Sequence, residues 1–98
     1  MAEHIRIHHN EQQQQFEYRN GDHLATLTYR FYKKDIAFMH TEVPEALAGK
    51  GIGSALAAFA FEHARKLNKK VMVYCPFVAS YLKRHPELGD QLDKDYLG

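Results

Sequence analysis

Three glycines at alternate positions give residues 49–54 the sequence GKGIGS, whose composition suits anion binding. Glycine has no Cβ, so the backbone can turn tightly there and come close to a ligand. The segment precedes a run with helical periodicity, and a helix start presents unpaired N–H groups and the positive end of the helix dipole. Such a site can hold a phosphate group. We therefore predict that the protein binds a phosphorylated cofactor through residues 49–54.

The order of residues in this segment excludes the two most familiar nucleotide-binding motifs. The P-loop requires G-x-x-x-x-G-K-[ST], whereas Lys50 stands between glycines and Ser54 follows Gly53. The dinucleotide fingerprint G-x-G-x-x-G also fails on spacing, and no acidic residue follows in the required context. Taken by itself, the motif is equally compatible with a strand-to-helix turn that uses glycine for geometry alone.

Hydrophobic periodicity predicts the elements that position this segment. Alternating apolar and polar residues predict antiparallel strands at residues 4–8, 16–19, 23–32 and 36–43. Asn20-Gly21 predicts a type I′ hairpin between the second and third strands. In the fourth strand, strict alternation places Ile36, Phe38, His40 and Glu42 on one face.

The second half of the chain is predicted to form a helix, a strand and a second helix. Apolar residues at helical spacing predict a long helix at residues 55–67, and the apolar run at residues 71–75 predicts a buried parallel strand. Pro76 suits the first position of a short C-terminal helix. The predicted fold is α/β (α+β), with a mixed and mostly antiparallel sheet of about five strands and a right-handed crossover.

Composition limits the classes of protein this chain can represent. At 98 residues, 45% hydrophobic and 26% charged, it is expected to form one soluble domain over residues 1–98. A net charge of +1 argues against nucleic acid as a partner, and one cysteine excludes an internal disulfide. The seven histidines show no paired ligand spacing, so we expect no metal. No membrane or signal segment is evident, and we expect a cytoplasmic monomer or weak homodimer.

The glycine turn between a strand and a long helix resembles the acetyl-CoA-binding core of the GNAT superfamily of N-acetyltransferases. The superfamily's pyrophosphate motif, [QR]-x-x-G-x-[GA], matches at Gly51 and Gly53, whereas Ala48 replaces the usual Arg or Gln. A second motif, N-x-x-x-x-x-Y, places Cys75 at the Asn position and Tyr81 at the Tyr position. The chain is most similar to very short, single-domain members of the YjdJ type. These carry H-T-x-V, G-[KQ]-G-[IV]-G and C-[PS]-F segments, which here lie at residues 40–43, 49–53 and 75–77.

The resemblance implies transfer of an acetyl group from acetyl-CoA to an amine on a small molecule or a protein. Backbone groups near Val43 would align the thioester, and Tyr81 would protonate the leaving thiolate. His40 and Glu42 are the nearest candidate bases for the amine. The implied CoA-binding residues are Val43, Gly49, Lys50, Gly51, Ile52, Gly53 and Ser54, with Lys50 as the cation.

Each candidate catalytic residue also has a structural interpretation. Tyr81 could cap the core, His40 could be a satisfied core histidine, and Glu42 could be a solvated strand end. Cys75 could be a small buried hydrophobe, or an acyl-carrying nucleophile whose place before Pro76 and a helix start favours the thiolate. By the resemblance, the chain is also expected to lack the N-terminal helices that build much of the acceptor pocket in the superfamily. A CoA or acyl-CoA-binding module with little or no catalysis is therefore the alternative function.

Overall fold

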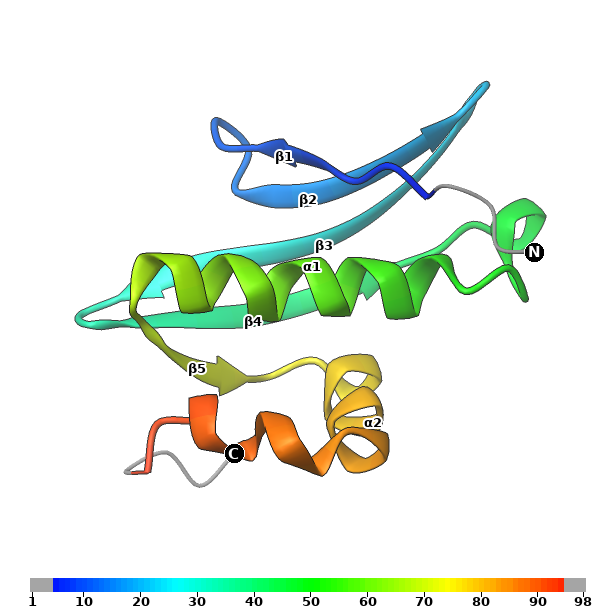
Figure 1. Ribbon diagram of the computed structural model, residues 1–98. Coiled ribbons are helices and arrows are strands. Elements are labelled where there is room, and N and C mark those ends of the chain that lie inside the picture. Colours follow the sequence, from blue (N-terminus) through cyan, green and yellow to red (C-terminus); the bar gives the residue numbers. More distant parts are fainter. Residues whose placement is uncertain (1–4, 95–98) are drawn as a thin grey trace.

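A five-stranded sheet forms the centre of the computed structural model, which describes residues 5–94 (Figure 1). Its order follows the chain: β1 (His8–Asn10), β2 (Gln15–Asn20), β3 (His23–Tyr32), β4 (Asp35–Glu42) and β5 (Lys70–Val73). All neighbours are antiparallel except β4 and β5, which are parallel. The predicted mixed, mostly antiparallel five-stranded sheet is confirmed.

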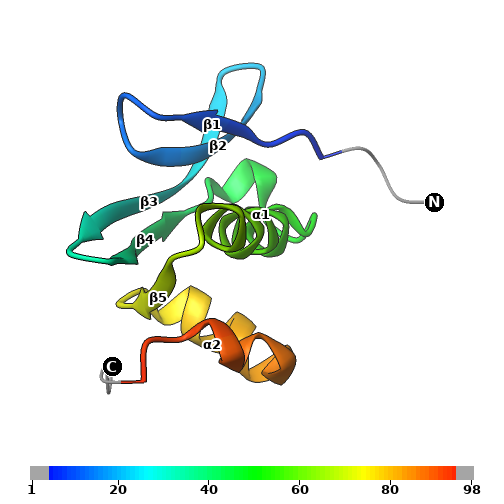
Figure 2. The same ribbon diagram turned by 60° about the vertical axis from the view of Figure 1, so that its left-hand side comes forward.

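Two helices pack on one face of this sheet. Helix α1 (Ile52–Leu67) connects β4 to β5, and α2 (Pro76–Arg84) follows β5. Two short 3-10 helices, η1 (Glu45–Leu47) and η2 (Pro86–Gln91), flank them in sequence. Figure 2, seen nearly along the α1 axis, shows α1 and α2 on the same side of the sheet. The other side, which we call the outer face, carries no helix within the part of the chain that the structure describes.

The predictions for the first strand and for the β2–β3 hairpin need correction. The first strand is predicted at residues 4–8 but begins only at His8, and residue 4 lies outside the described residues. The hairpin between β2 and β3 turns on Gly21 and Asp22, one residue later than predicted, because Asn20 still pairs with His23. Gly21 has a φ of 61°, whereas Asp22 does not have a positive φ. A type I′ turn needs positive φ at both positions, so that prediction is wrong.

A bulge in β4 changes which residues face the core. Tyr29 of β3 pairs with Phe38, but Thr28 pairs with His40, so Met39 is an extra residue in β4. Beyond the bulge, Thr41 lies opposite the buried Leu27, and His40 lies on the outer face. The prediction that His40 and Glu42 share a face with Ile36 and Phe38 is therefore wrong. His40 is exposed, which also removes the interpretation of a satisfied core histidine.

The core lies between the inner face of the sheet and α1. Small residues on α1 let the helix approach the sheet closely, and its buried positions, among them Leu56, Ala60 and Ala64, recur at helical spacing. Asn68 ends the helix as predicted, with φ 59° and its N–H directed to the carbonyls of Ala64 and Arg65. The largest fully buried side chains are Tyr29, Phe16, Phe38, Phe61, Leu27, Ile36, Leu56, Val71 and Val78.

The short strand β1 is held to α1 by a cluster of rings. His9 Nε2 and the Tyr29 hydroxyl lie 2.6 Å apart, and the His9 and His63 ring centroids are 4.3 Å apart. Phe16 packs against both imidazoles, with centroid distances of 5.0 Å to His9 and 5.4 Å to His63. Burial lowers the pKa of His63, and the neighbouring His9 and Lys66 lower it further.

We predict that this cluster makes the fold less stable in mild acid. The unfolded chain carries an ordinary histidine with a pKa near 6.5, so it binds a proton more readily than folded His63 does. Stability is then fully present above pH 6.5 and is lost as the pH falls through the lower folded pKa. Urea unfolding at pH 7.5 and pH 5 should show a smaller acid loss in His63→Phe than in the natural chain. Equal losses in both proteins would contradict this prediction, since contributions from other groups such as Asp35 are common to both.

Candidate active site

The glycine turn, defined as residues 49–54, leads from η1 into α1. Gly49 and Gly51 have φ values of 77° and 80°, in the left-handed region that side chains with a Cβ rarely adopt. Gly51 is the N-cap of α1, and its carbonyl accepts the first helical hydrogen bond, from the Ala55 N–H at 3.0 Å. No side chain caps this helix end. The N–H groups of residues 52–54 are therefore without intrahelical acceptors.

The third glycine of the motif has a different role. Gly53 lies within α1, and a Cβ placed on it would lie 2.6 Å from Cζ of Phe77 in α2. Contacts this short do not occur between a Cβ and another heavy atom, so the Phe77 ring would have to move. Gly53 thus lets the Phe77 ring cover the first turn of α1. Gly49 and Gly51 are thus suited to the positive φ of the backbone, whereas Gly53 makes room for a neighbouring ring.

A cavity of about 300 Å³ opens at the start of α1. Its wall combines the end of β4, η1, the glycine turn and one face of α2. The lining residues are Val43, Leu47, Ala48, Gly49, Gly51, Ile52, Gly53, Ser54, Phe77 and Arg84. The structure thus brings together six of the seven residues predicted to bind CoA. Lys50 is exposed and does not line the cavity, whereas Arg84 of α2 does.

Arg84 and Phe77 are the lining residues of α2 that sequence analysis missed. They lie seven positions apart, which places them on one face of a helix, two turns from each other. Arg84 is exposed and forms no ion pair with any residue between 5 and 94. It supplies a cation at the cavity wall in a chain where Ala48 replaces the usual Arg or Gln of the pyrophosphate motif. The C-P-F segment at residues 75–77 was the available signal for Phe77; no local pattern indicated Arg84.

The parallel strands β4 and β5 part next to this cavity. Their last pair is Phe38 and Val73, and the Tyr74 N–H donates to the Phe38 carbonyl at 3.0 Å. Beyond that point β4 continues to Glu42, while the segment after β5 turns away into α2. We call this opening the strand split. The Cys75 thiol spans it by donating to the Thr41 hydroxyl at 3.2 Å.

Cys75 and Tyr81 are both buried, with 2% and 7% of their surface exposed. Cys75 is the N-cap of α2 and lies at the strand split. Tyr81 stacks on His85 at a centroid distance of 4.3 Å and on Phe61 at 6.3 Å. Burial raises the pKa of Tyr81, with a further contribution from Glu87, so its phenol is protonated at neutral pH. Tyr81 is thus a core side chain that keeps a proton to donate, and neither residue lines the cavity.

The two candidate bases lie on the opposite side of the sheet from the helices. The bulge at Met39 turns His40 outward beside Thr28, and Glu42 pairs with Thr26 in the same orientation. Both are exposed. They therefore lie across the sheet from α1 and α2, and neither of them lines the cavity.

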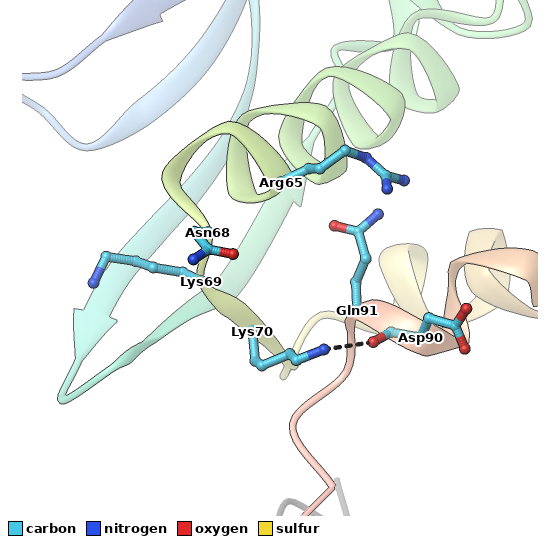
Figure 3. A pocket seen from close by; sticks show the side chains of 6 residues that line it. All are labelled: Arg65, Asn68, Lys69, Lys70, Asp90 and Gln91. Atoms are coloured by element: carbon cyan, nitrogen blue, oxygen red, sulfur yellow. Dashed lines mark hydrogen bonds between the residues drawn. The ribbon is translucent and has the colours of Figure 1, made fainter.

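A second group of cations, at the far end of α1, has a structural role (Figure 3). Lys70 Nζ donates to the Asp90 carbonyl at 2.9 Å, and Lys69 Nζ lies 5.4 Å from the centre of the Phe31 ring. With its amide oriented to satisfy both neighbours, Gln91 accepts from Arg65 and donates to the Phe61 carbonyl. Cations here also favour the negative end of the helix dipole. The Lys70 and Gln91 contacts hold η2 against α1 and β5.

Two further expectations concern groups that could bind a metal or cross a membrane. Within residues 5–94, no group of three or more His, Cys, Asp or Glu side chains is arranged to hold a metal ion. None of the described helices is long and apolar enough to cross a membrane. The expectation of a protein that works without a metal stays a prediction.

Comparison with known proteins identifies the family. The sequence profile of the GCN5-related N-acetyl-transferases matches residues 15–92. The chain is 38% identical to Protein NATD1 of Mus musculus and 36% identical to that of Xenopus tropicalis, each over 85 residues. These matches cover 84% of this chain and 77% and 78% of the relatives. The NMR solution structure of a GCN5-like protein from Staphylococcus aureus is also similar, with a TM-score of 0.71 and 32% identity. That match covers 96% of this chain and 89% of the other.

The chain belongs to the GCN5-related N-acetyltransferase family, as the resemblance in its motifs implied. This family normally uses acetyl-CoA, which contains the pyrophosphate that an uncapped helix start suits. Membership supports acetyl transfer in general terms and leaves the acceptor open.

Proposed function

We propose that this protein transfers an acetyl group from acetyl-CoA to an amine. The observation that carries the proposal is the uncapped start of α1, which opens into a cavity beside the strand split. The N–H groups of residues 52–54 would bind the pyrophosphate, with Arg84 as a nearby cation. The thioester would then lie toward Val43 and the split, where the pairing between β4 and β5 has ended.

The chemistry at the split is nucleophilic attack on the thioester carbonyl carbon. A neutral amine forms the C–N bond, the C–S bond breaks, the departing CoA thiolate takes up one proton from a donor, and the proton that the attacking nitrogen loses restores that donor. Tyr81 is the proposed proton donor, because its raised pKa keeps the phenol protonated at neutral pH. His40 and Glu42, on the outer face, are the proposed acceptors of the proton that the ammonium group releases before attack.

Direct transfer fits Cys75 better than an acyl-enzyme does. The thiol donates its hydrogen to Thr41 and is almost fully buried, as expected for a cysteine that packs as a small hydrophobe. A nucleophilic cysteine needs an accessible thiolate, and within residues 5–94 no hydrogen bond or ion pair joins Cys75 to a cationic side chain. We therefore propose that Cys75 closes the inner side of the split and that acetyl transfer does not pass through it.

We predict that Arg84 contributes more to CoA affinity than Lys50 does. Arg84→Gln should weaken CoA binding about 2- to 5-fold at low ionic strength, as expected for one partly screened charge contact. Lys50→Ala should have a smaller effect in the same direction, because Lys50 does not line the cavity. Calorimetry at two salt concentrations measures both losses, and both should shrink as salt rises. Lys83→Gln, which removes the neighbouring cation outside the cavity, is the control. If Lys83→Gln weakens CoA binding as much as Arg84→Gln does, the effect of Arg84 comes from the net charge of the protein and not from a contact in the cavity.

Mass spectrometry tests the function itself. The purified protein is incubated with acetyl-CoA and a panel of small amines and peptides, and acetylated products and free CoA are quantified. Enzyme-dependent release of CoA in step with acetylated amine is the expected result. If CoA binds but no amine in the panel gains an acetyl group, the alternative function, a CoA or acyl-CoA-binding module, is the better interpretation.

A further inference from the structure

A groove of about 510 Å³ crosses the outer face of the sheet over β3, β4 and β5. Ala37, Met39 and Met72 contribute its apolar floor, and Tyr32 and Tyr74 form its edges. These two tyrosines expose 56% and 52% of their surface, and Met39 exposes 38%. A contiguous apolar surface of this kind on a small protein marks a binding site more often than chance. The volume falls within the range of small-molecule sites.

One end of the groove opens on the strand split. Tyr74 directly follows β5 and its N–H donates to the Phe38 carbonyl, and Met39 is the bulged residue next to Phe38 in β4. The split therefore faces the groove on the outer side of the sheet, and the Cys75–Thr41 hydrogen bond lies on its inner side. A molecule in the groove can reach the atoms between β4 and β5 without displacing a helix, because the described helices lie on the other side (Figure 2).

The charges around the groove differ between its two ends. Arg30 lines the end away from the split, and no residue between 5 and 94 forms an ion pair with it. Lys33, whose Nζ lies 5.5 Å from the centre of the Tyr32 ring, adds a second cation at that end. His40 and Glu42 lie on the same face beyond the split. The groove is thus positive at one end, apolar in the middle and able to accept a proton or attract a cation at the other.

We propose that this outer groove binds the acceptor, and that the acceptor is a small amine joined to a carboxylate by an apolar chain. The carboxylate would pair with Arg30, the chain would lie over Met39 and Met72, and the amine would enter the split. Arg30 lies opposite Ala37, and Met39 lies two positions after Ala37, a rise of about 7 Å along the strand. A chain of about five methylene groups spans a similar length. The inference rests on the proposed acetyl transfer and adds the substrate class to it.

The reaction with such an acceptor balances without a further reactant. The ammonium group releases one proton toward His40 or Glu42, and the free amine attacks the thioester carbon. The C–N bond forms as the C–S bond breaks, the CoA thiolate takes one proton from Tyr81, and the second proton lost by the attacking nitrogen restores the Tyr81 phenol. The products are an N-acetylated amino acid that keeps its carboxylate, and CoA.

The probes are 6-aminohexanoate and hexylamine, which share the apolar chain and the amine but differ in the carboxylate. NMR titration of isotope-labelled protein, saturated with CoA, measures where and how tightly each probe binds. We expect shifts at Met39, Met72 and Tyr74 and an affinity about 3- to 5-fold higher for 6-aminohexanoate, the size of one exposed ion pair. The preference should disappear in Arg30→Gln. The preference should survive in Lys34→Gln, which removes a cation of the nearby β3–β4 turn that does not line the groove.

The same probes assayed for acetyl transfer separate this inference from the proposed function. Shifts confined to other surfaces, or a preference that survives in Arg30→Gln, would overturn the groove assignment even if amines are acetylated. Binding in the groove with the Arg30-dependent preference, but without transfer of acetyl groups to either probe, would instead overturn the transferase function and keep the ligand class. Transfer with a matching Arg30-dependent preference in kcat/KM would support both.

Discussion

Gly51→Asp should lower the affinity for CoA by about 100-fold or more, which corresponds to roughly 2.7 kcal/mol. Gly51 has a φ of 80° at the N-cap of α1, and a residue with a Cβ is strained by about 1–2 kcal/mol in that conformation. The new carboxylate would also lie where the pyrophosphate is expected, so two negative groups would share the start of one helix. Strain and repulsion act in the same direction. Isothermal titration calorimetry with CoA measures the loss.

Gly21→Asp provides a matched control for this prediction. Gly21 also has a positive φ, 61°, and nothing lies within 4 Å of a Cβ placed on either glycine. The backbone cost of the two substitutions is therefore similar, but Gly21 lies in the β2–β3 turn and not in the cavity wall. Gly21→Asp should keep its affinity for CoA. If Gly51→Asp binds CoA as tightly as this control does, the glycine turn is not the CoA site.

Tyr81→Phe should lower kcat for acetyl transfer by about 100-fold or more, with little change in CoA affinity. Removing a general acid that protonates a leaving group typically costs a factor of 10² to 10⁴. The substitution keeps the ring that stacks on Phe61 and His85, so the packing of α2 should persist. Stopped assays of CoA release at saturating acetyl-CoA measure kcat directly.

Cys75→Ala separates the two possible routes and should be assayed beside Tyr81→Phe. Direct transfer predicts that Cys75→Ala keeps most of its kcat, after a modest loss of stability from the lost thiol and its hydrogen bond to Thr41. An acyl-enzyme route predicts the opposite: loss of transfer in Cys75→Ala, and an acetyl group on Cys75 in the natural chain. If both variants keep full turnover, neither residue takes part in the reaction, and other groups must be sought at the split.

Periodicity alone was sufficient for most of the fold because nearly every element has one buried face. β3 occupies residues 23–32 as predicted, since Ala25, Leu27 and Tyr29 alternate with polar residues and are buried. The same rule failed at β4. The bulge at Met39 leaves no mark on a pattern of apolar residues, and one extra residue reverses every side chain after it. His40 and Glu42 were therefore assigned to the wrong face.

The candidate site was predictable to the extent that it is local in sequence. Gly49, Gly51 and the start of α1 form a contiguous segment whose requirements are encoded in the glycines themselves. The contributions of Phe77 and Arg84 depend on how α2 packs across α1, which no short window of sequence determines. The same is true of the strand split. It depends on where β5 stops pairing with β4, so the contact between Cys75 and Thr41 could not be predicted from either residue.

NMR titration of isotope-labelled protein with acetyl-CoA tests the central claim most directly. The claim is that the uncapped start of α1 binds the pyrophosphate and that the thioester lies at the strand split. It predicts saturable shifts of the N–H resonances of residues 52–54, with further shifts at Val43 and Cys75, and no change in the β1–β2 turn. The absence of saturable shifts at residues 52–54, or shifts confined to the cations at the opposite end of α1, would contradict it.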